Sequence, residues 1–327
     1  MNIGRVLLPM AAVAGLVALS ACSAAAGDTR TTDGRLKVTA SFYPMQYLAE
    51  QIGGSHVSVT GLTKPGTEPH DLELTPRQIG RLGQSGVVVY LKGLQPAVDE
   101  AIAQSGVRHI VDAASLTALE DHGTEVDGEH HTTGDNHSDP GPDEEDPHHH
   151  EDAGADPHIW LDPVKYAQVA EGVGRTLAQA DPDHAALYAE NTDALVKKLD
   201  ALNTAFTDGL RNRTSDTFLT THAAFGYLAE RYGLVEEAVN GIDPEAEPSA
   251  ARMRALQDLA KDRQVSTVFF ETLVSDRTAK TLAGDLDLRT DVLDPIEGIT
   301  DRSRGSDYFG VQRANLKALQ TALGATT

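Results

Sequence analysis

The stretch Val87-Val88-Val89-Tyr90-Leu91 decides the fold, because it is apolar on both faces. Such a strand is typical of a parallel sheet that helices cover on both sides. Other short apolar runs that read as strands flank it at 36–42, 57–62 and 109–112. Helical patterns, each opened by a proline that suits a first helical turn, lie between these runs at 44–52, 76–82 and 96–103. This alternation predicts an α/β lobe with a mainly parallel sheet.

The same alternation restarts in the second half of the chain. Strands are expected at 217–221, 265–270 and 289–293, and helices at 223–232, 248–262, 275–283 and 307–323. Between the halves, a helical pattern from Pro163 is followed by a longer one over 183–211, which would extend roughly 40 Å. The predicted fold is therefore two parallel-sheet α/β lobes, at 36–182 and 213–327, joined by one long backbone helix at 183–212. Ligands of such a fold lie at the carboxyl ends of the strands, in the cleft between the lobes.

The N-terminus reads as an export signal. Arg5 precedes a short apolar run over 6–19, and Leu19-Ser20-Ala21-Cys22 closes it. This ending resembles a bacterial lipobox, in which the cysteine is lipidated and becomes the first mature residue. We therefore expect a signal peptide at 1–21, lipidation of Cys22 and a tether at 22–35; the alternative is an uncleaved anchor. Cys22 is the only cysteine, so an internal disulfide is excluded.

The charge balance excludes some partners. The formal net charge is −22, and removal of 1–21 would take away only one charged residue, Arg5. An acidic body of this kind argues against nucleic acid and against binding to anionic lipid through a basic patch. It also favours the accumulation of cations near the surface.

A long acidic, Gly/Pro/His-rich insertion interrupts the first lobe at 120–156. It has no Lys or Arg, and carboxylates surround its seven histidines, which are His122, His130, His131, His137, His148, His149 and His150. Imidazoles and carboxylates without competing cations attract divalent metal. Three interpretations stay open for this loop: a low-affinity collector of zinc, a sensor of high zinc, or a solvated spacer.

Four metal-competent residues occupy strand exits or ordered loops, two from each half. They are His70, His158, His222 and Asp294. Any one of these histidines alone would more often be a cap or a surface residue. Three imidazoles and one carboxylate together suit a four-coordinate Zn²⁺ site, and Glu68 is an alternative oxygen donor beside His70.

Longer motifs around these residues give a specific resemblance. They are Gly66-Thr67-Glu68-Pro69-His70-Asp71-Leu72-Glu73-Leu74-Thr75-Pro76, Asp156-Pro157-His158-Ile159-Trp160-Leu161-Asp162-Pro163, Thr220-Thr221-His222-Ala223-Ala224-Phe225-Gly226-Tyr227 and the segment from Tyr308-Phe309 to Asn315-Leu316. They resemble the zinc- and manganese-binding solute-binding lipoproteins of bacterial ABC importers, over nearly the whole of 36–323. The resemblance implies a metal ion held between two lobes by His70, His158, His222 and Asp294.

The resemblance also implies partners and a preferred metal. In this family the zinc branch uses three histidines with a carboxylate or water and carries an acidic His-rich loop before the second ligand, whereas the manganese and iron branch has Glu in place of His222. We therefore expect capture of Zn²⁺ at the outer face of the cell membrane, delivery to an ABC permease, a lipid-anchored monomer and no enzymatic activity. The alternatives are a Mn²⁺/Fe²⁺ transport protein or a metal-dependent adhesin of the same fold. A zinc hydrolase is a weaker alternative because no His-Glu-x-x-His spacing occurs.

Overall fold

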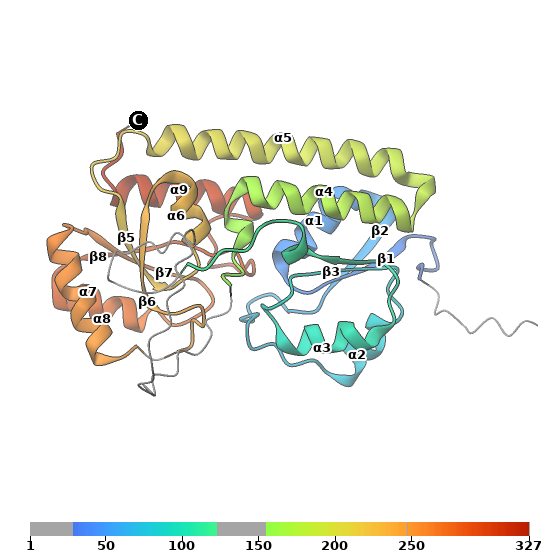
Figure 1. Cartoon of the computed structure of the whole chain (residues 1–327), viewed down its shortest axis with the longest axis horizontal. Helices are drawn as coiled ribbons and strands as arrows, with labels where there is room; N and C mark the ends of the chain where they lie inside the picture. Colours follow the sequence, from blue (N-terminus) through green and yellow to red (C-terminus); the bar gives the residue numbers. More distant parts are fainter. Residues whose placement is uncertain (1–28, 123–154, 247, 327) are drawn as a thin grey trace, which may run out of the picture.

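The computed structural model describes residues 29–122, 155–246 and 248–326. Two four-stranded parallel sheets lie side by side, and one long helix, α5 (Ala185–Leu210), runs along both of them (Figure 1). The predicted class, two parallel-sheet α/β lobes joined by a long helix, is confirmed. The expected signal peptide, Cys22 and the loop histidines from His130 to His150 lie outside the described residues.

The first lobe is built on the strand order β2-β1-β3-β4. Its strands are β1 (Leu36–Ala40), β2 (Val57–Gly61), β3 (Val87–Tyr90) and β4 (Ile110–Asp112). Its helices are α1 (Tyr43–Gly53), α2 (Pro76–Leu82) and α3 (Pro96–Ser105). Val87 and Val89 belong to the main core, whereas Val88 and Tyr90 pack with residues of α2 and α3. β3 is therefore buried on both faces, as its sequence predicts.

The second lobe repeats this plan with the order β6-β5-β7-β8. Its strands are β5 (Thr217–His222), β6 (Val235–Asn240), β7 (Thr267–Phe270) and β8 (Arg289–Val292). Its helices are α6 (Gly226–Tyr232), α7 (Ala250–Asp262), α8 (Arg277–Leu286) and α9 (Tyr308–Ala322).

Strand β6 has no counterpart in the sequence-based prediction, because Glu236 and Glu237 interrupt its apolar pattern. The fold gives both carboxylates partners. Glu236 accepts hydrogen bonds from the Thr220 hydroxyl and the Phe225 backbone N–H, and Glu237 pairs with Arg252 at 3.5 Å. Tertiary contacts thus override a poor local strand propensity.

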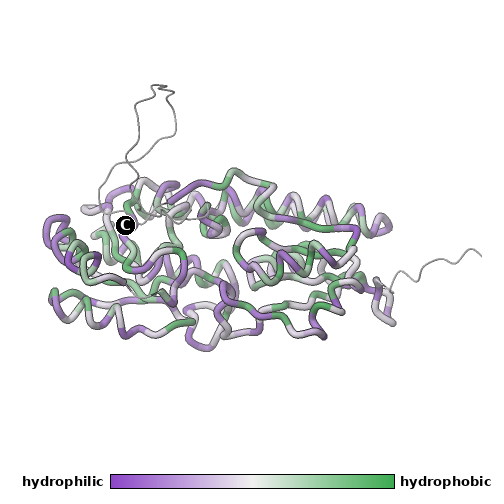
Figure 2. The backbone as a smooth tube through the Cα atoms, turned by 60° about the horizontal axis from the view of Figure 1, so that its bottom comes forward, coloured by the Kyte–Doolittle hydropathy of each residue, from purple (hydrophilic) through white to green (hydrophobic). Residues whose placement is uncertain are grey.

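Helices α4 (Pro163–Ala180) and α5 (Ala185–Leu210) connect the lobes. The 26 residues of α5 extend about 39 Å, and the helix contacts α1 in the first lobe and α6 and α9 in the second. Hydrophobic and hydrophilic residues alternate along the helices instead of forming one apolar stretch (Figure 2). None of the helices in the described part of the chain is long and apolar enough to cross a membrane.

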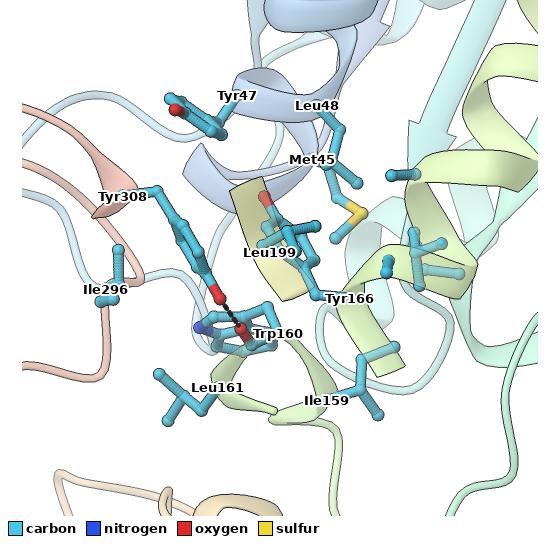
Figure 3. Packing of buried hydrophobic residues seen from close by; sticks show 14 of the residues in the cluster. Met45, Tyr47, Leu48, Ile159, Trp160, Leu161, Tyr166, Leu199, Ile296 and Tyr308 are labelled. Carbon is cyan, nitrogen blue, oxygen red and sulfur yellow. Dashed lines mark hydrogen bonds between the residues drawn. The ribbon is translucent and has the colours of Figure 1, made fainter. Parts of the chain in front are cut away.

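A continuous aromatic and aliphatic core fixes the lobes to each other (Figure 3). The Trp160 indole N–H donates to the Pro295 carbonyl at 2.6 Å, and the Tyr308 hydroxyl donates to the Trp160 carbonyl at 2.6 Å. Tyr47 from α1 stacks on Tyr308 from α9, with ring centroids 5.8 Å apart. Buried aromatic rings with satisfied polar atoms hold the segment 157–161 rigidly between the two sheets.

Candidate metal centre

Three of the predicted ligands meet between the lobes. His70 lies in the loop between β2 and α2, His158 directly precedes a 3₁₀ turn (Ile159–Leu161), and His222 is the last residue of β5. Their ring centroids are 5.4 to 6.3 Å apart. His158 and His222 are almost completely buried, and the His70 side chain is 11% exposed. Strand exits and loops of two lobes thus converge on one small volume.

The fourth member of this group is Glu297, and not the predicted Asp294. One potential ligand atom each from His70, His158, His222 and Glu297 lies within 4.8 Å of the others. The Oε1 atom of Glu297 is 3.3 Å from Nε2 of His70 and 3.3 Å from Nε2 of His158. It lies 3.7 Å from Nε2 of His222.

Asp294 is buried, but its carboxylate is committed to holding the turn that follows β8. One oxygen accepts from the Ile296 backbone N–H at 2.8 Å, and the other accepts from the Thr272 hydroxyl at 3.0 Å. The Asn315 side chain bonds both the N–H and the carbonyl of Asp294. At the predicted strand exit it is therefore Glu297, and not Asp294, whose carboxylate lies beside the three histidines.

The backbone at Ile296 directs Glu297 toward the histidines. Ile296 has a φ of 60°, which is unfavourable for a β-branched residue, and its side chain is completely buried. Strained backbone of this kind persists only where the surrounding structure fixes it, and it is concentrated at functional sites. Here two hydrogen bonds hold the peptide unit before Ile296: its carbonyl, from Pro295, accepts from Trp160, and its N–H, from Ile296, donates to Asp294.

Two buried carboxylates orient two of the imidazoles. Nδ1 of His158 lies 2.8 Å from Oδ1 of Asp156, and Nδ1 of His222 lies 2.7 Å from Oε1 of Glu271. A neutral histidine that donates its Nδ1–H to a carboxylate presents an unprotonated Nε2, which is the usual arrangement around a metal ion. Neither Asp156 nor Glu271 was identified as part of the site from the sequence.

Several buried polar atoms at the centre have no hydrogen-bond partner among the described residues. They include Nε2 of His158, Nε2 of His222 and Oε2 of Glu297. Leaving such atoms unsatisfied costs roughly 1–3 kcal/mol each, so native proteins rarely do so without a reason. The two imidazoles and the Glu297 carboxylate each offer one ligand atom within 4.8 Å of the others, which is the pattern expected where a cation is bound.

The electrostatics show the same preference for a cation. Burial alone would raise the pKa of Glu297, but the three imidazoles outweigh it and hold that pKa well below the usual range. Burial would lower the pKa of His158, but Asp156 and Glu297 raise it to about 9. Without a metal ion, the carboxylates therefore favour the protonated forms of His158 and His222; a divalent cation would supply the same positive charge.

The donor set fits zinc. Tetrahedral zinc with bonds of about 2.0–2.2 Å places its ligand atoms about 3.3 Å apart, close to the distances around Glu297 Oε1. Three imidazoles with one carboxylate favour Zn²⁺ over Mn²⁺, which prefers more oxygen ligands.

The other predicted residues lie at the edge of this centre or outside the described residues. Glu68 accepts from the His70 backbone N–H at 3.0 Å, and its Oε1 is 4.0 Å from Nε2 of His70. Burial and the Glu297 charge raise the pKa of Glu68 to about 7. His122 is separate from the centre, and its Nδ1 lies 2.7 Å from Asp156.

Comparison with known proteins gives a consistent result. The sequence profile of the family described as zinc-uptake complex component A, periplasmic, matches residues 38–322. The zinc-binding lipoprotein AdcA of Streptococcus pneumoniae is 33% identical over 92% of this chain, but the match covers only 58% of that protein. The high-affinity zinc uptake system protein ZnuA of Bacillus subtilis is 30% identical, with 97% of both chains covered.

Solved structures agree with this assignment. The Zn(II)-bound ZnuA-like domain of Streptococcus pneumoniae AdcA superposes with a TM-score of 0.71 at 28% identity, covering 89% of this chain and 99% of that one. The laminin-binding protein Lmb of Streptococcus agalactiae gives 0.73 at 26% identity, covering 88% and 99%. Since the family profile and a full-length relative both span nearly the whole chain, the protein belongs to the family of zinc-uptake complex component A.

Proposed function

We propose that this protein captures Zn²⁺ outside the cytoplasm and delivers it to an ABC permease for high-affinity zinc uptake. The observation that carries the proposal is the buried group of His70, His158, His222 and Glu297, in which polar atoms of three members have no hydrogen-bond partner. Zinc is the cargo of this centre and not a resident cofactor. Membership of a zinc-uptake family supports the same function and agrees with the absence of an enzymatic role.

The geometry favours binding over hydrolysis. A catalytic zinc site keeps one coordination position open for water. Four protein ligands would occupy every position of a tetrahedral ion here, and the centre is almost fully buried. The same set of ligands argues against the Mn²⁺/Fe²⁺ alternative, because three of the four donors are nitrogen atoms.

Delivery to a membrane permease is supported by the proposed lipid anchor. Lipidation of Cys22, with 22–35 as a tether, would hold the lobes near the outer face of the membrane as a monomer. The proposed boundaries are 36–182 and 213–327 for the lobes and 183–212 for the linking helix. Replacing Cys22 with Ser should release the protein into a soluble extracytoplasmic fraction or leave it unprocessed; a normally cleaved variant that stays with membranes would place the anchor elsewhere.

The acidic insertion is proposed to collect zinc weakly and pass it to the centre. Replacing the six histidines from His130 to His150 with Gln should remove weak zinc sites and leave the tight one. Loss of the tight site in that variant would mean that the insertion supplies a primary ligand.

Metal selectivity tests the function most simply. Protein purified without chelator should contain one equivalent of tightly held zinc, and it should retain zinc against excess Mn²⁺. Expression in a zinc-uptake-deficient bacterium should restore growth on limiting zinc, and the His158→Ala variant should not. Tighter binding of Mn²⁺ than of Zn²⁺ would contradict the proposal.

A further inference from the structure

A second group of metal-competent side chains lies outside the buried centre. One potential ligand atom each from Glu120, His122 and Glu230 lies within 4.8 Å of the others. Nε2 of His122 is 3.2 Å from a carboxylate oxygen of Glu230 and 3.9 Å from one of Glu120. Glu120 and His122 come from the segment that leaves the first lobe after β4, whereas Glu230 lies on α6 of the second lobe.

The imidazole of this group is oriented in the same way as those of His158 and His222. Nδ1 of His122 lies 2.7 Å from Oδ2 of Asp156, the carboxylate whose other oxygen bonds His158. One buried carboxylate therefore supports two imidazoles and leaves both Nε2 atoms directed away from it. This is the arrangement that prepares a histidine for a metal ion.

The surroundings leave space for the His122 ring. A side-chain carbon at Gly226 would come within 2.4 Å of that ring, so glycine is required there. The Tyr227 ring meets His122 edge-on, with centroids 4.4 Å apart. The Tyr227 hydroxyl accepts from the Glu120 N–H and donates to the Asp156 carbonyl, which joins the two chain segments at this point.

We propose that Glu120, His122 and Glu230 form a second, exchangeable divalent-cation site that links the two lobes and takes Zn²⁺. One imidazole and two carboxylates suit zinc, with water completing the coordination. The ligand atoms are further apart than the roughly 3.3 Å of a tetrahedral zinc site, so the exposed carboxylates must move inward. The Glu230 side chain is 61% exposed, which leaves it room to move, whereas that of Glu120 is 36% exposed and is also held by Lys165.

Two features make this site weaker than the buried centre. Solvent screens exposed charges, so each carboxylate contributes less attraction than Glu297. Lys165 already pairs with the other oxygen of Glu120 at 2.6 Å and neutralises part of its charge. The site does not depend on the proposed function, because it shares no ligand with the centre.

Zinc titration of the full chain by calorimetry tests this proposal. The histidines of the insertion would obscure the result, so His130, His131, His137, His148, His149 and His150 are first replaced with Gln. In this background Glu230→Gln is compared with Glu190→Gln, an exposed glutamate on α5 that serves as the matched control. His122→Gln, whose amide is still able to bond Asp156, is the second variant.

The background protein and the Glu190→Gln control should bind two equivalents of zinc, one tight and one weak. Glu230→Gln and His122→Gln should weaken the second equivalent by at least about tenfold and leave the first unchanged. A missing second equivalent in the background, or equal affinities in Glu230→Gln and Glu190→Gln, would overturn the site and leave an ion-pair cluster only. A missing first equivalent would instead overturn the proposed function, while the second stayed measurable.

Discussion

The buried centre and the exposed Glu120–His122–Glu230 group differ in environment more than in chemistry. Both combine imidazole with carboxylate, and both take support from Asp156. The centre has two imidazoles at nearly zero exposure and a third that is 11% exposed, whereas the second group has one imidazole and two solvated carboxylates. The difference indicates that burial and fixed orientation, and not the presence of suitable ligands alone, determine how tightly a cation is held.

Removing a ligand from the centre should have the largest effect. His158→Ala removes one of three imidazoles and leaves Asp156 without that partner. Its zinc affinity should fall by more than the roughly 10- to 100-fold typical of losing an outer partner. Competition with a chelator of known zinc affinity measures this loss. His109→Ala is the control, because His109 lies directly before β4, at the amino end of that strand, and is not a member of the buried centre. An unchanged affinity in His158→Ala would remove it from the centre.

Asp156 contacts an imidazole in each region, so replacing it should change the zinc affinity of both. Asp156→Asn should weaken the buried centre roughly 10- to 100-fold, since the amide no longer attracts a proton to Nδ1 of His158 as strongly. It should weaken the second group as well. Glu271→Gln should weaken only the centre, because Glu271 is the Nδ1 partner of His222, whereas the Nδ1 partner of His122 is Asp156. If Glu271→Gln lowered the zinc affinity of the second group as much as Asp156→Asn does, the contact between Asp156 and His122 would not be the cause.

Acid should weaken zinc binding at the buried centre, because zinc must displace protons there. The pKa of His158 is raised to about 9 by Asp156 and Glu297, against the opposing effect of burial. Below that pH the metal-free centre holds a proton on His158, so zinc binding at neutral pH must release it. Apparent affinity should therefore fall as the pH falls from about 9. Calorimetry in buffers of different ionisation enthalpy measures the protons released; zero release at pH 7 would contradict the assignment.

The smallest expected effect concerns the tyrosine between the two regions. Tyr227→Phe removes the hydroxyl that bonds Glu120 and Asp156. The unfolding free energy should fall by about 1–2 kcal/mol, and the affinity of the buried centre should not change. Urea denaturation of the zinc-free protein provides the measurement. A loss of tight zinc binding would show that the Glu120 segment supports the centre directly.

The sequence predicted most of the fold because its signals are local. The apolar run at Val87–Tyr90 and the proline-opened helices specify a parallel α/β lobe, and the 183–211 pattern matches α5 within a few residues. Strand β6 was missed because its two glutamates are stabilised by contacts with Thr220, Phe225 and Arg252, which a local pattern does not reveal.

The predicted site depended on a different kind of information. His70, His158 and His222 lie in distinctive motifs, and the structure brings them together. Glu297 is three residues beyond the predicted Asp294, and its approach depends on the positive φ of Ile296, which has no sequence signal. Asp156 lies only two residues before His158, so its hydrogen bond to that histidine could have been predicted from the sequence. Glu271 is 49 positions from His222 and gave no such indication.

The most direct test of the account is the crystal structure of the zinc-loaded protein, with anomalous diffraction measured at the zinc edge. The account predicts one fully occupied zinc ion about 2.0–2.2 Å from Nε2 of His70, His158 and His222 and from a carboxylate oxygen of Glu297. In that structure Asp294 should still bond Ile296 and Thr272. Zinc ligated by Asp294, or tight zinc lying away from these three histidines, would contradict it.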